Sequence, residues 1–195
     1  MKFNLSEIND LIRDRRSIPP EKYSARKIHK EQIELLLNNA IWAPTHGKTQ
    51  PWLFSVFTDE GKQKLSVFLS EEYKRTCSED LFSNAKFENL KNRPLLASAA
   101  IVVSMKRQET EKIEEIEEIE AVACAIQNIL LTATACGFAS FWSTPKFIYT
   151  EAMNDFLGLN NKDKCLGIIY IGYPNEEWPK GQRKPIEYFT QWITQ

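Results

Sequence analysis

Two adjacent arginines and a serine, Arg15, Arg16 and Ser17, carry groups that can bind a phosphate. Guanidinium groups bind phosphate through charge-assisted and often bidentate hydrogen bonds, and a hydroxyl can add another. Arginines at this position also complement the negative end of a helix dipole while staying solvated. The segment alone therefore leaves two interpretations open, a phosphate site and a solvated helix end.

A proline-bracketed loop at residues 43–52 concentrates side chains that donate and accept hydrogen bonds. Its candidate binding residues are Pro44, Thr45, His46 and Gln50. Such a loop can line a polar ring system. It can equally be a surface loop whose histidine is satisfied locally, so both interpretations stay open.

A third segment, residues 137–145, ends a β-prone stretch with an aromatic residue and two small polar residues, Trp142, Ser143 and Thr144. Such an end presents polar groups at the edge of a sheet, where a cofactor could contact them. By itself the pattern is more typical of core packing than of cofactor contact.

A basic patch follows the last apolar run of the chain and includes Lys180, Arg183 and Lys184. These charges fit a solvated tail. They also fit an anion site shared with the arginines near the N-terminus. Only the fold can decide whether residues so far apart in the chain converge.

The overall charge gives no reason to expect a polyanionic partner. Lys and Arg number 25 against 26 Asp and Glu, a formal net charge of -1, so the global field attracts neither nucleic acid nor an anionic membrane surface. The N-terminus lacks the apolar run of a signal peptide, and no later stretch has the length of a membrane span. We therefore expect a cytoplasmic protein with no nucleic-acid partner and no membrane association.

Metal chemistry is not indicated by the histidines and cysteines. His29 and His46 are the two histidines, and neither lies within ligand spacing of a second histidine or a cysteine. The four cysteines form no CxxC pair, and two lie in apolar segments, which favours structural thiols. The sequence predicts no metal site.

The spacing of apolar residues predicts a chain dominated by helices. The first two helices end where Pro19 and Pro44 follow, because proline restricts the residue before it. Residues 59–92 are expected to contain two helices that end before Pro94. One long helix, which Gly137 terminates, is expected from residue 109, with its glutamates on a solvated face. Thr150 is expected to cap a short helix that ends at Gly158.

Short β-prone runs predict four strands between these helices. The expected strands cover residues 52–57, 100–105, 138–142 and 166–171. Because helical stretches separate most of them, the pattern indicates a small sheet covered by helices. With 195 residues and ordinary composition, we expect one domain over residues 1–195.

The order of the four polar segments resembles the nitroreductase family over almost the whole chain. The resemblance implies an FMN cofactor whose phosphate and ribityl chain contact Arg15, Arg16 and Ser17. It also implies that the loop 43–52 contacts the flavin from a second subunit, and that Arg183 and Lys184 reach the phosphate. The flavin contacts that the resemblance implies are Arg15, Arg16, Ser17, Trp42, Pro44, Thr45, His46, Gln50, Trp142, Ser143, Thr144, Arg183 and Lys184.

The family fold implied by this resemblance is an α+β sandwich, with a central, mostly antiparallel sheet flanked by helices in an intertwined homodimer. FMN would lie at the subunit interface. NADH or NADPH would reduce it by a ping-pong mechanism, and a small-molecule acceptor such as a nitroaromatic, a quinone or an activated alkene would be reduced next. No side chain of the protein is then needed as a catalytic nucleophile.

Two departures from the family pattern concern flavin tuning and substrate choice. After Arg-Arg-Ser the next basic residue is Lys22, later than in many relatives, and Lys48 stands where many larger members have asparagine. Three alternatives stay open. The chain could perform a related flavin reaction such as dehalogenation, bind flavin with little turnover, or act as a helical interaction module through its glutamate-rich stretch.

Overall fold

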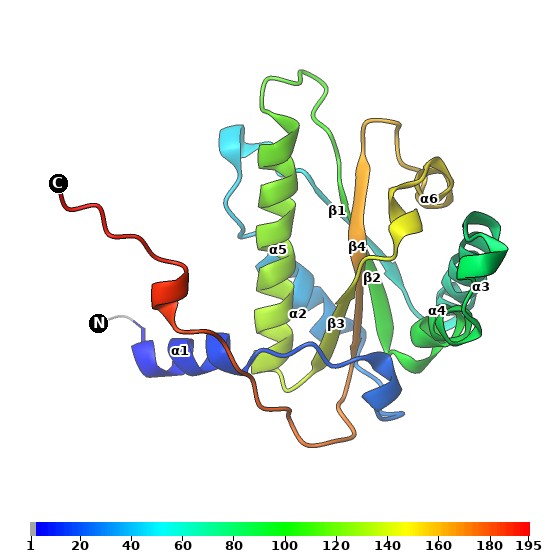
Figure 1. Cartoon of the computed structure of the whole chain (residues 1–195), viewed down its shortest axis with the longest axis horizontal. Helices are drawn as coiled ribbons and strands as arrows, with labels where there is room; N and C mark the ends of the chain where they lie inside the picture. The colour runs from blue at the N-terminus through cyan, green and yellow to red at the C-terminus, as the bar shows by residue number, and fades with distance from the viewer. Residues whose placement is uncertain (1–2) are drawn as a thin grey trace.

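A four-stranded antiparallel sheet forms the centre of the molecule in the computed structural model, which describes residues 3–195 (Figure 1). The strand order is β1-β2-β4-β3. Its members are β1 (Trp52–Phe57), β2 (Ala99–Met105), β3 (Ala139–Ser143) and β4 (Lys164–Gly172). All four strands expected from the sequence are present, and the prediction of an antiparallel sheet is confirmed.

Helices cover both faces of this sheet. One face carries α2 (Lys30–Ala40) and α5 (Glu115–Ala135), and the other carries α3 (Asp59–Thr76), α4 (Asn84–Leu96) and α6 (Glu151–Leu157) (Figure 1). Alternate residues of a strand point to opposite faces, so Ile101 and Val103 pack with α5 whereas Ala100 and Val102 pack with α3. A sheet buried on both sides explains why β2 is apolar at nearly every position. The α+β sandwich is confirmed.

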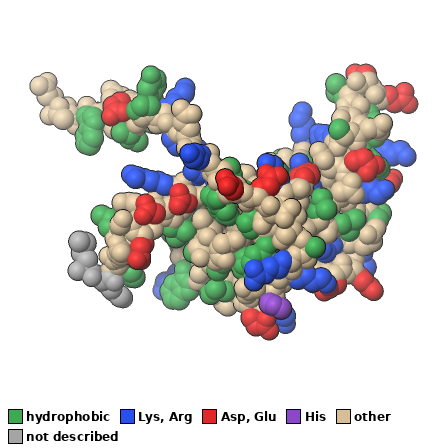
Figure 2. Space-filling view, turned by 90° about the horizontal axis from the view of Figure 1, so that it is seen from below, with side chains coloured by type: hydrophobic (Ala, Val, Ile, Leu, Met, Phe, Trp, Pro, Cys, Tyr) green, Lys and Arg blue, Asp and Glu red, His purple; other side chains and the backbone are tan. Residues whose placement is uncertain are grey.

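Both ends of the chain leave this layered body. The helix α1 (Leu5–Asp14) has no buried residue although one side of it is apolar. The C-terminal tail after β4 passes the C-terminal end of α1 and then extends away from the sheet and its helices (Figure 1). It contains one short 3-10 turn, η5 (Ile186–Tyr188). Large apolar side chains are exposed on both segments, among them Leu5, Ile8, Ile12, Ile186, Tyr188, Phe189, Trp192 and Ile193. Figure 2 shows apolar side chains gathered along the projecting tail.

The long helix begins later than predicted. We expected it from residue 109, but α5 starts at Glu115, and residues 109–114 form a turn. Glu111 has a φ of 48°, which a helix cannot contain, and the Arg107 guanidinium donates a hydrogen bond of 2.7 Å to the Ile113 carbonyl. The turn is therefore held by a side chain from the end of β2. The predicted end is confirmed, since Gly137 follows the helix with a φ of 71°.

Two expectations about helix ends were wrong in detail. We expected the second helix of residues 59–92 to end before Pro94, yet α4 continues through Pro94 to Leu96. Pro94 removes only one amide donor near the helix end, and it is buried together with Leu90. Thr150 does occupy the N-cap position of α6, but its hydroxyl donates to the Phe147 carbonyl at 2.7 Å and does not cap an amide.

None of the helices in residues 3–195 combines the length and the apolar character that crossing a membrane requires.

Candidate functional site

The two ends of the chain meet beside Arg16. The Arg16 Nε donates a hydrogen bond of 2.9 Å to the Pro179 carbonyl, and the Trp178 indole N–H donates one of 2.5 Å to the Asp14 carbonyl. A Cβ on Gly181 would overlap the Arg16 guanidinium, so the guanidinium could not keep this position beside any other residue. A cavity of about 640 Å³ is lined by both segments and by the end of α5. The predicted convergence of the N-terminal and C-terminal basic segments is therefore seen in the fold.

Arg15 and Arg16 have different surroundings. The Arg16 guanidinium donates to three backbone carbonyls, those of Arg13, Arg15 and Pro179. Arg15 makes no ion pair with any carboxylate of residues 3–195. Partial burial lowers its pKa, and the neighbouring Arg183 and Arg16 lower it further. Arg15 and Arg183 thus form a cationic pair without an acidic partner, which is the arrangement that an anion stabilises.

Ser17 links this basic cluster to β3. Ser17 forms an isolated parallel bridge with Ser140, and the Ile18 amide donates to the Ser140 carbonyl at 2.9 Å. The Ser140 hydroxyl is buried and has no hydrogen-bond partner among the described residues. A buried hydroxyl of this kind is costly unless something bonds it. The strand that carries Trp142 therefore starts beside the arginine cluster and runs away from it.

The far end of β3 opens into a second cavity of about 640 Å³. Trp142, Ser143 and Thr144 form one wall. The Trp142 indole donates to the Leu166 carbonyl at 3.1 Å, and it lies over Gly167, where a side chain would collide with it. The tryptophan is thus held in place at the rim of the cavity. β3 spans roughly 13 Å from its first residue to its last, so the arginine cluster and this cavity lie at opposite ends of one short strand.

The opposite wall of this cavity comes from α4, which we did not expect to contribute. Lys86, Asn89 and Arg93 line it. Residues spaced by three and four lie on one side of a helix, so the spacing 86, 89, 93 could have indicated a common polar face. The sequence did not indicate which face of α4 would meet β3.

The loop 43–52 lies at the other end of α5 from the arginines. His46 Nδ1 bonds the Glu117 carboxylate, and Gly47 packs against the Ile113 side chain at the start of the helix. Arg16, in contrast, lines a cavity with Thr134 at the end of the helix. Seventeen residues of α-helix separate these two points, a rise of about 25 Å. Within one chain, the structure therefore does not bring the loop and the phosphate candidates together.

The loop itself has an unusual backbone. Lys48 and Gln50 have φ values of 57° and 48°, in the left-handed region that side chains rarely adopt. The Thr45 hydroxyl accepts a hydrogen bond of 3.2 Å from the Gln50 amide, which closes the loop. Trp42, just before it, is 84% exposed. Pro44, His46 and Gln50 are likewise exposed on the surface of the chain.

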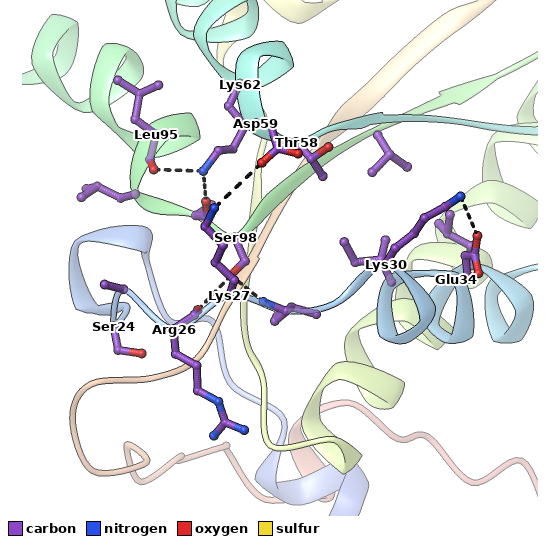
Figure 3. Close-up of a pocket in the computed structure, with 17 residues that line it drawn as sticks. Ser24, Arg26, Lys27, Lys30, Glu34, Thr58, Asp59, Lys62, Leu95 and Ser98 are labelled. Carbon is purple, nitrogen blue, oxygen red and sulfur yellow. Dashed lines mark hydrogen bonds and ion pairs between the residues drawn. The ribbon is translucent and has the colours of Figure 1, made fainter.

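A third cavity contains none of the residues predicted from the sequence. It has a volume of about 850 Å³ and lies between the segment before α2, the start of α3 and the end of α4 (Figure 3). Lys62 lies in its wall and donates to the Leu95 and Ala97 carbonyls at 3.2 and 2.6 Å, so this ammonium caps α4. Two ion pairs also lie along this cavity, Lys27 with Asp59 and Lys30 with Glu34. Each of these three lysines thus already has a carbonyl or carboxylate partner, whereas Arg15 has no carboxylate partner among residues 3–195.

Comparison with known proteins gives one consistent result. Residues 12–173 match the model of the Nitroreductase family. YfhC of Bacillus subtilis (strain 168), whose assigned name is NAD(P)H nitroreductase, is 27% identical over 187 residues, which cover 95% of this chain and 94% of YfhC.

Solved structures agree with this match. The nitroreductase-like family protein from Bacillus cereus is 29% identical and superposes with a TM-score of 0.83 over 99% of this chain and 98% of its own. The FMN-dependent nitroreductase NfnB from Mycobacterium smegmatis, solved in complex with NADPH, shares the fold with a TM-score of 0.77 at 17% identity, over 98% of this chain and all of its own.

Proposed function

The chain belongs to the nitroreductase family, and on that premise we propose that it is an NAD(P)H-dependent oxidoreductase that uses FMN to reduce nitroaromatics, quinones or activated alkenes. Relatives are named as NAD(P)H nitroreductases, and an FMN-dependent neighbour has the same fold. The observation that carries the proposal is the cluster of Arg15 and Arg183, which no carboxylate of residues 3–195 pairs and in which the positive charge of Arg183 lowers the pKa of Arg15, because a phosphate bound there would relieve this repulsion.

The residues of this cluster fit the phosphate end of FMN. Arg15 and Arg183 would bind the phosphate, with Lys184 nearby on the same tail. Arg16 would hold the tail in place through its bond to Pro179. Ser17 and the unpartnered Ser140 hydroxyl are placed to bond the ribityl chain. Both kinds of group that the cofactor needs at this end are thus present.

The ring of the flavin would lie at the other end of β3, where Trp142, Ser143 and Thr144 line the cavity. FMN accepts a hydride from NAD(P)H and passes the electrons to an acceptor. The residues of the protein would orient the ring, exclude water and bond its polar edge. Donor and acceptor would use the same space in turn, which gives ping-pong kinetics.

A homodimer would complete the site. His46 and Gln50 lie about 25 Å from the arginine cluster of their own chain and face outward, so they would contact the flavin of the partner subunit. The projecting ends of the chain provide the contact surface. The exposed side of α5 would extend this contact surface, because residues 121–135 contain no charged side chain that burial would penalise. Two copies would bury these apolar surfaces against each other.

The visible spectrum of the purified protein tests the cofactor and the activity together. We expect a yellow protein with flavin absorbance that bleaches when NADH or NADPH is added without oxygen and recovers when a nitroaromatic or quinone is added. A protein that binds FMN but is reduced only slowly would be a flavin-binding protein with little turnover. A folded protein that takes up no FMN would contradict the proposal.

The phosphate site is tested by a pair of neighbouring arginines. Arg15→Gln should weaken FMN binding about tenfold or more, because it removes a charge-assisted hydrogen bond to the phosphate. Arg13→Gln, two residues earlier on the exposed last turn of α1, is the matched control and should leave the Kd unchanged. Both are measured by fluorescence titration of the apoprotein with FMN. Equal effects of the two substitutions would refute the assignment of Arg15.

A further inference from the structure

The cavity between β3 and α4 has a lining that selects a particular kind of molecule. Its charged residues are all basic, namely Lys86, Arg93 and Lys146. No aspartate or glutamate lines it, although acidic residues slightly outnumber basic ones in the whole chain. The positive charge is therefore a local property of this cavity.

Two of the three cations lack an acidic partner. Lys86 Nζ lies 4.8 Å above the centre of the Tyr73 ring, and Lys146 has no ion pair with any of residues 3–195. Arg93 differs, because its Nε donates to Glu21 at 2.8 Å. Lys86 comes from α4 and Lys146 directly follows the segment after β3, so the two ammonium groups come from opposite walls of the cavity. Both ammonium groups are free to bind an anion.

The remaining lining is aromatic and neutral. Phe141 and Trp142 belong to the β3 wall, and the Arg93 guanidinium lies 5.0 Å above the Phe141 ring. Ser143 and Thr144 add hydroxyl groups. A volume of about 640 Å³ is in the range of pockets that hold small aromatic molecules. Flat apolar surface beside unpaired ammonium groups favours a ring that carries a negative charge.

We propose that this cavity gives the enzyme a preference for acceptors that are aromatic anions, such as nitroaromatic carboxylates, with Lys86 and Lys146 binding the carboxylate. The inference rests on the proposed function, because the Trp142–Thr144 wall is shared with the predicted flavin contacts. For a nitro compound the reaction is ArNO2 + NAD(P)H + H+ → ArNO + NAD(P)+ + H2O. The two electrons come from the nicotinamide, and the charge on the carboxylate is unchanged.

Two acceptors of the same size that differ in charge test this preference. The FMN-loaded protein is assayed with 4-nitrobenzoate and with 4-nitrobenzamide, and the ratio of their kcat/KM values is taken. We expect a ratio above one for the native protein. Lys86→Gln and Lys146→Gln should each lower it about three- to tenfold, because each removes one charge-assisted contact to the carboxylate. The kcat/KM with 4-nitrobenzamide should stay within about twofold of the native value. This result would show that the variants fold and bind FMN.

A matched control and a binding measurement separate this inference from the proposed function. Lys91→Gln alters another exposed lysine of α4 that does not line the cavity, and it should not change the ratio. Calorimetric titration with benzoate, which is not reduced, should show tighter binding than with benzamide, and both pocket variants should lose the difference.

The outcomes are distinct. An unchanged acceptor ratio in the two pocket variants would refute the inference. A variant that raises only the KM for NADH or NADPH would also refute it, because the lysines would then bind the phosphates of the donor. A protein that binds benzoate through these lysines but is not reduced by NAD(P)H would retain the anion site and refute the proposed function instead.

Discussion

Arg15 and Arg16 are adjacent in the chain, but their side chains make different contacts. Arg16 donates to three carbonyls and ties the C-terminal tail to the end of α1, whereas Arg15 lies close to Arg183 with no carboxylate paired to it. The sequence presents them as an equivalent pair. Only the position of Pro179 and Gly181 against one guanidinium distinguishes a structural arginine from a binding one.

Gly181→Ala tests the structural role of Arg16. The new Cβ would push the guanidinium away from the Pro179 carbonyl and release the tail. We expect limited trypsin digestion after Arg183 to become several times faster. Gly61→Ala is the control glycine, since a Cβ there would make only ordinary contacts with the Phe57 side chain at 3.8 Å or more, and it should leave cleavage in the tail unchanged. Unchanged cleavage in Gly181→Ala would show that the tail is held by other contacts.

The cysteines should differ sharply in reactivity. Burial raises the pKa of the Cys165 thiol to about 11, whereas Cys124 is exposed on α5. Because the folded pKa is raised above the ordinary value of 9.0, Cys165 contributes stability below pH 9 that is lost as the pH rises toward 11. At pH 8, iodoacetamide should reach Cys165 only after unfolding, and it should label Cys124 in the native protein only where no partner copy covers α5. Mass spectrometry of the labelled peptides measures both, and early labelling of Cys165 would contradict its burial.

At the scale of elements, the strands were predictable because each is a short run of apolar, mostly β-branched or aromatic residues, and β2 and β4 are buried on both faces. The helix ends were not. The turn before α5 depends on the Arg107 guanidinium, which bonds both the Ile113 carbonyl and the buried Glu118 carboxylate. Nothing in the local spacing of the isoleucines and glutamates reveals an arginine eleven residues away from its partner. Likewise, Pro94 ends no helix because tertiary packing outweighs one missing hydrogen bond.

The ion pair between Arg107 and Glu118 should therefore stabilise the turn before α5. The Arg107 Nη1 lies 2.5 Å from Glu118 Oε2, and both side chains are nearly inaccessible. Glu118→Leu leaves the arginine buried without its partner and should lower the Tm by roughly 5 to 10 °C. Adding Arg107→Met should recover part of that loss, because the uncompensated charge is gone. Calorimetry of the three variants checks this, and a double variant less stable than the single one would contradict it.

At the scale of the whole molecule, the two candidate halves of the site lie at opposite ends of α5. The sequence proposed both halves by residue type and left their convergence open, and the fold brings the N-terminal and C-terminal basic segments together at Arg16. The sequence could not show that the His46 loop lies beyond the reach of those arginines, since the distance follows from the length of α5. It also gave no sign that Lys86 and Arg93 of α4 face β3, because their spacing indicates a shared side of the helix but not the element that this side meets.

The projecting tail should be needed for assembly and for cofactor retention. It exposes Tyr188, Phe189 and Trp192, which a monomer would leave in water. Deletion of residues 185–195 should shift the protein from dimer to monomer in light scattering and reduce the FMN that copurifies with it. A truncated protein that is still a dimer with a full complement of FMN would show that the tail has no part in the interface.

The distance between the His46 loop and Arg15 has a genetic consequence. In the proposed homodimer, two impaired versions of this protein, one carrying Arg15→Gln and the other lacking the side chains of His46 and Gln50, should rescue each other when they are expressed together. In a dimer that contains one chain of each kind, one site would combine both defects. The other site would combine the intact Arg15 of one chain with the intact His46 and Gln50 of the other. A cell producing both defective chains would therefore regain up to a quarter of the normal activity under random pairing, because half of the pairs are mixed and each has one intact centre.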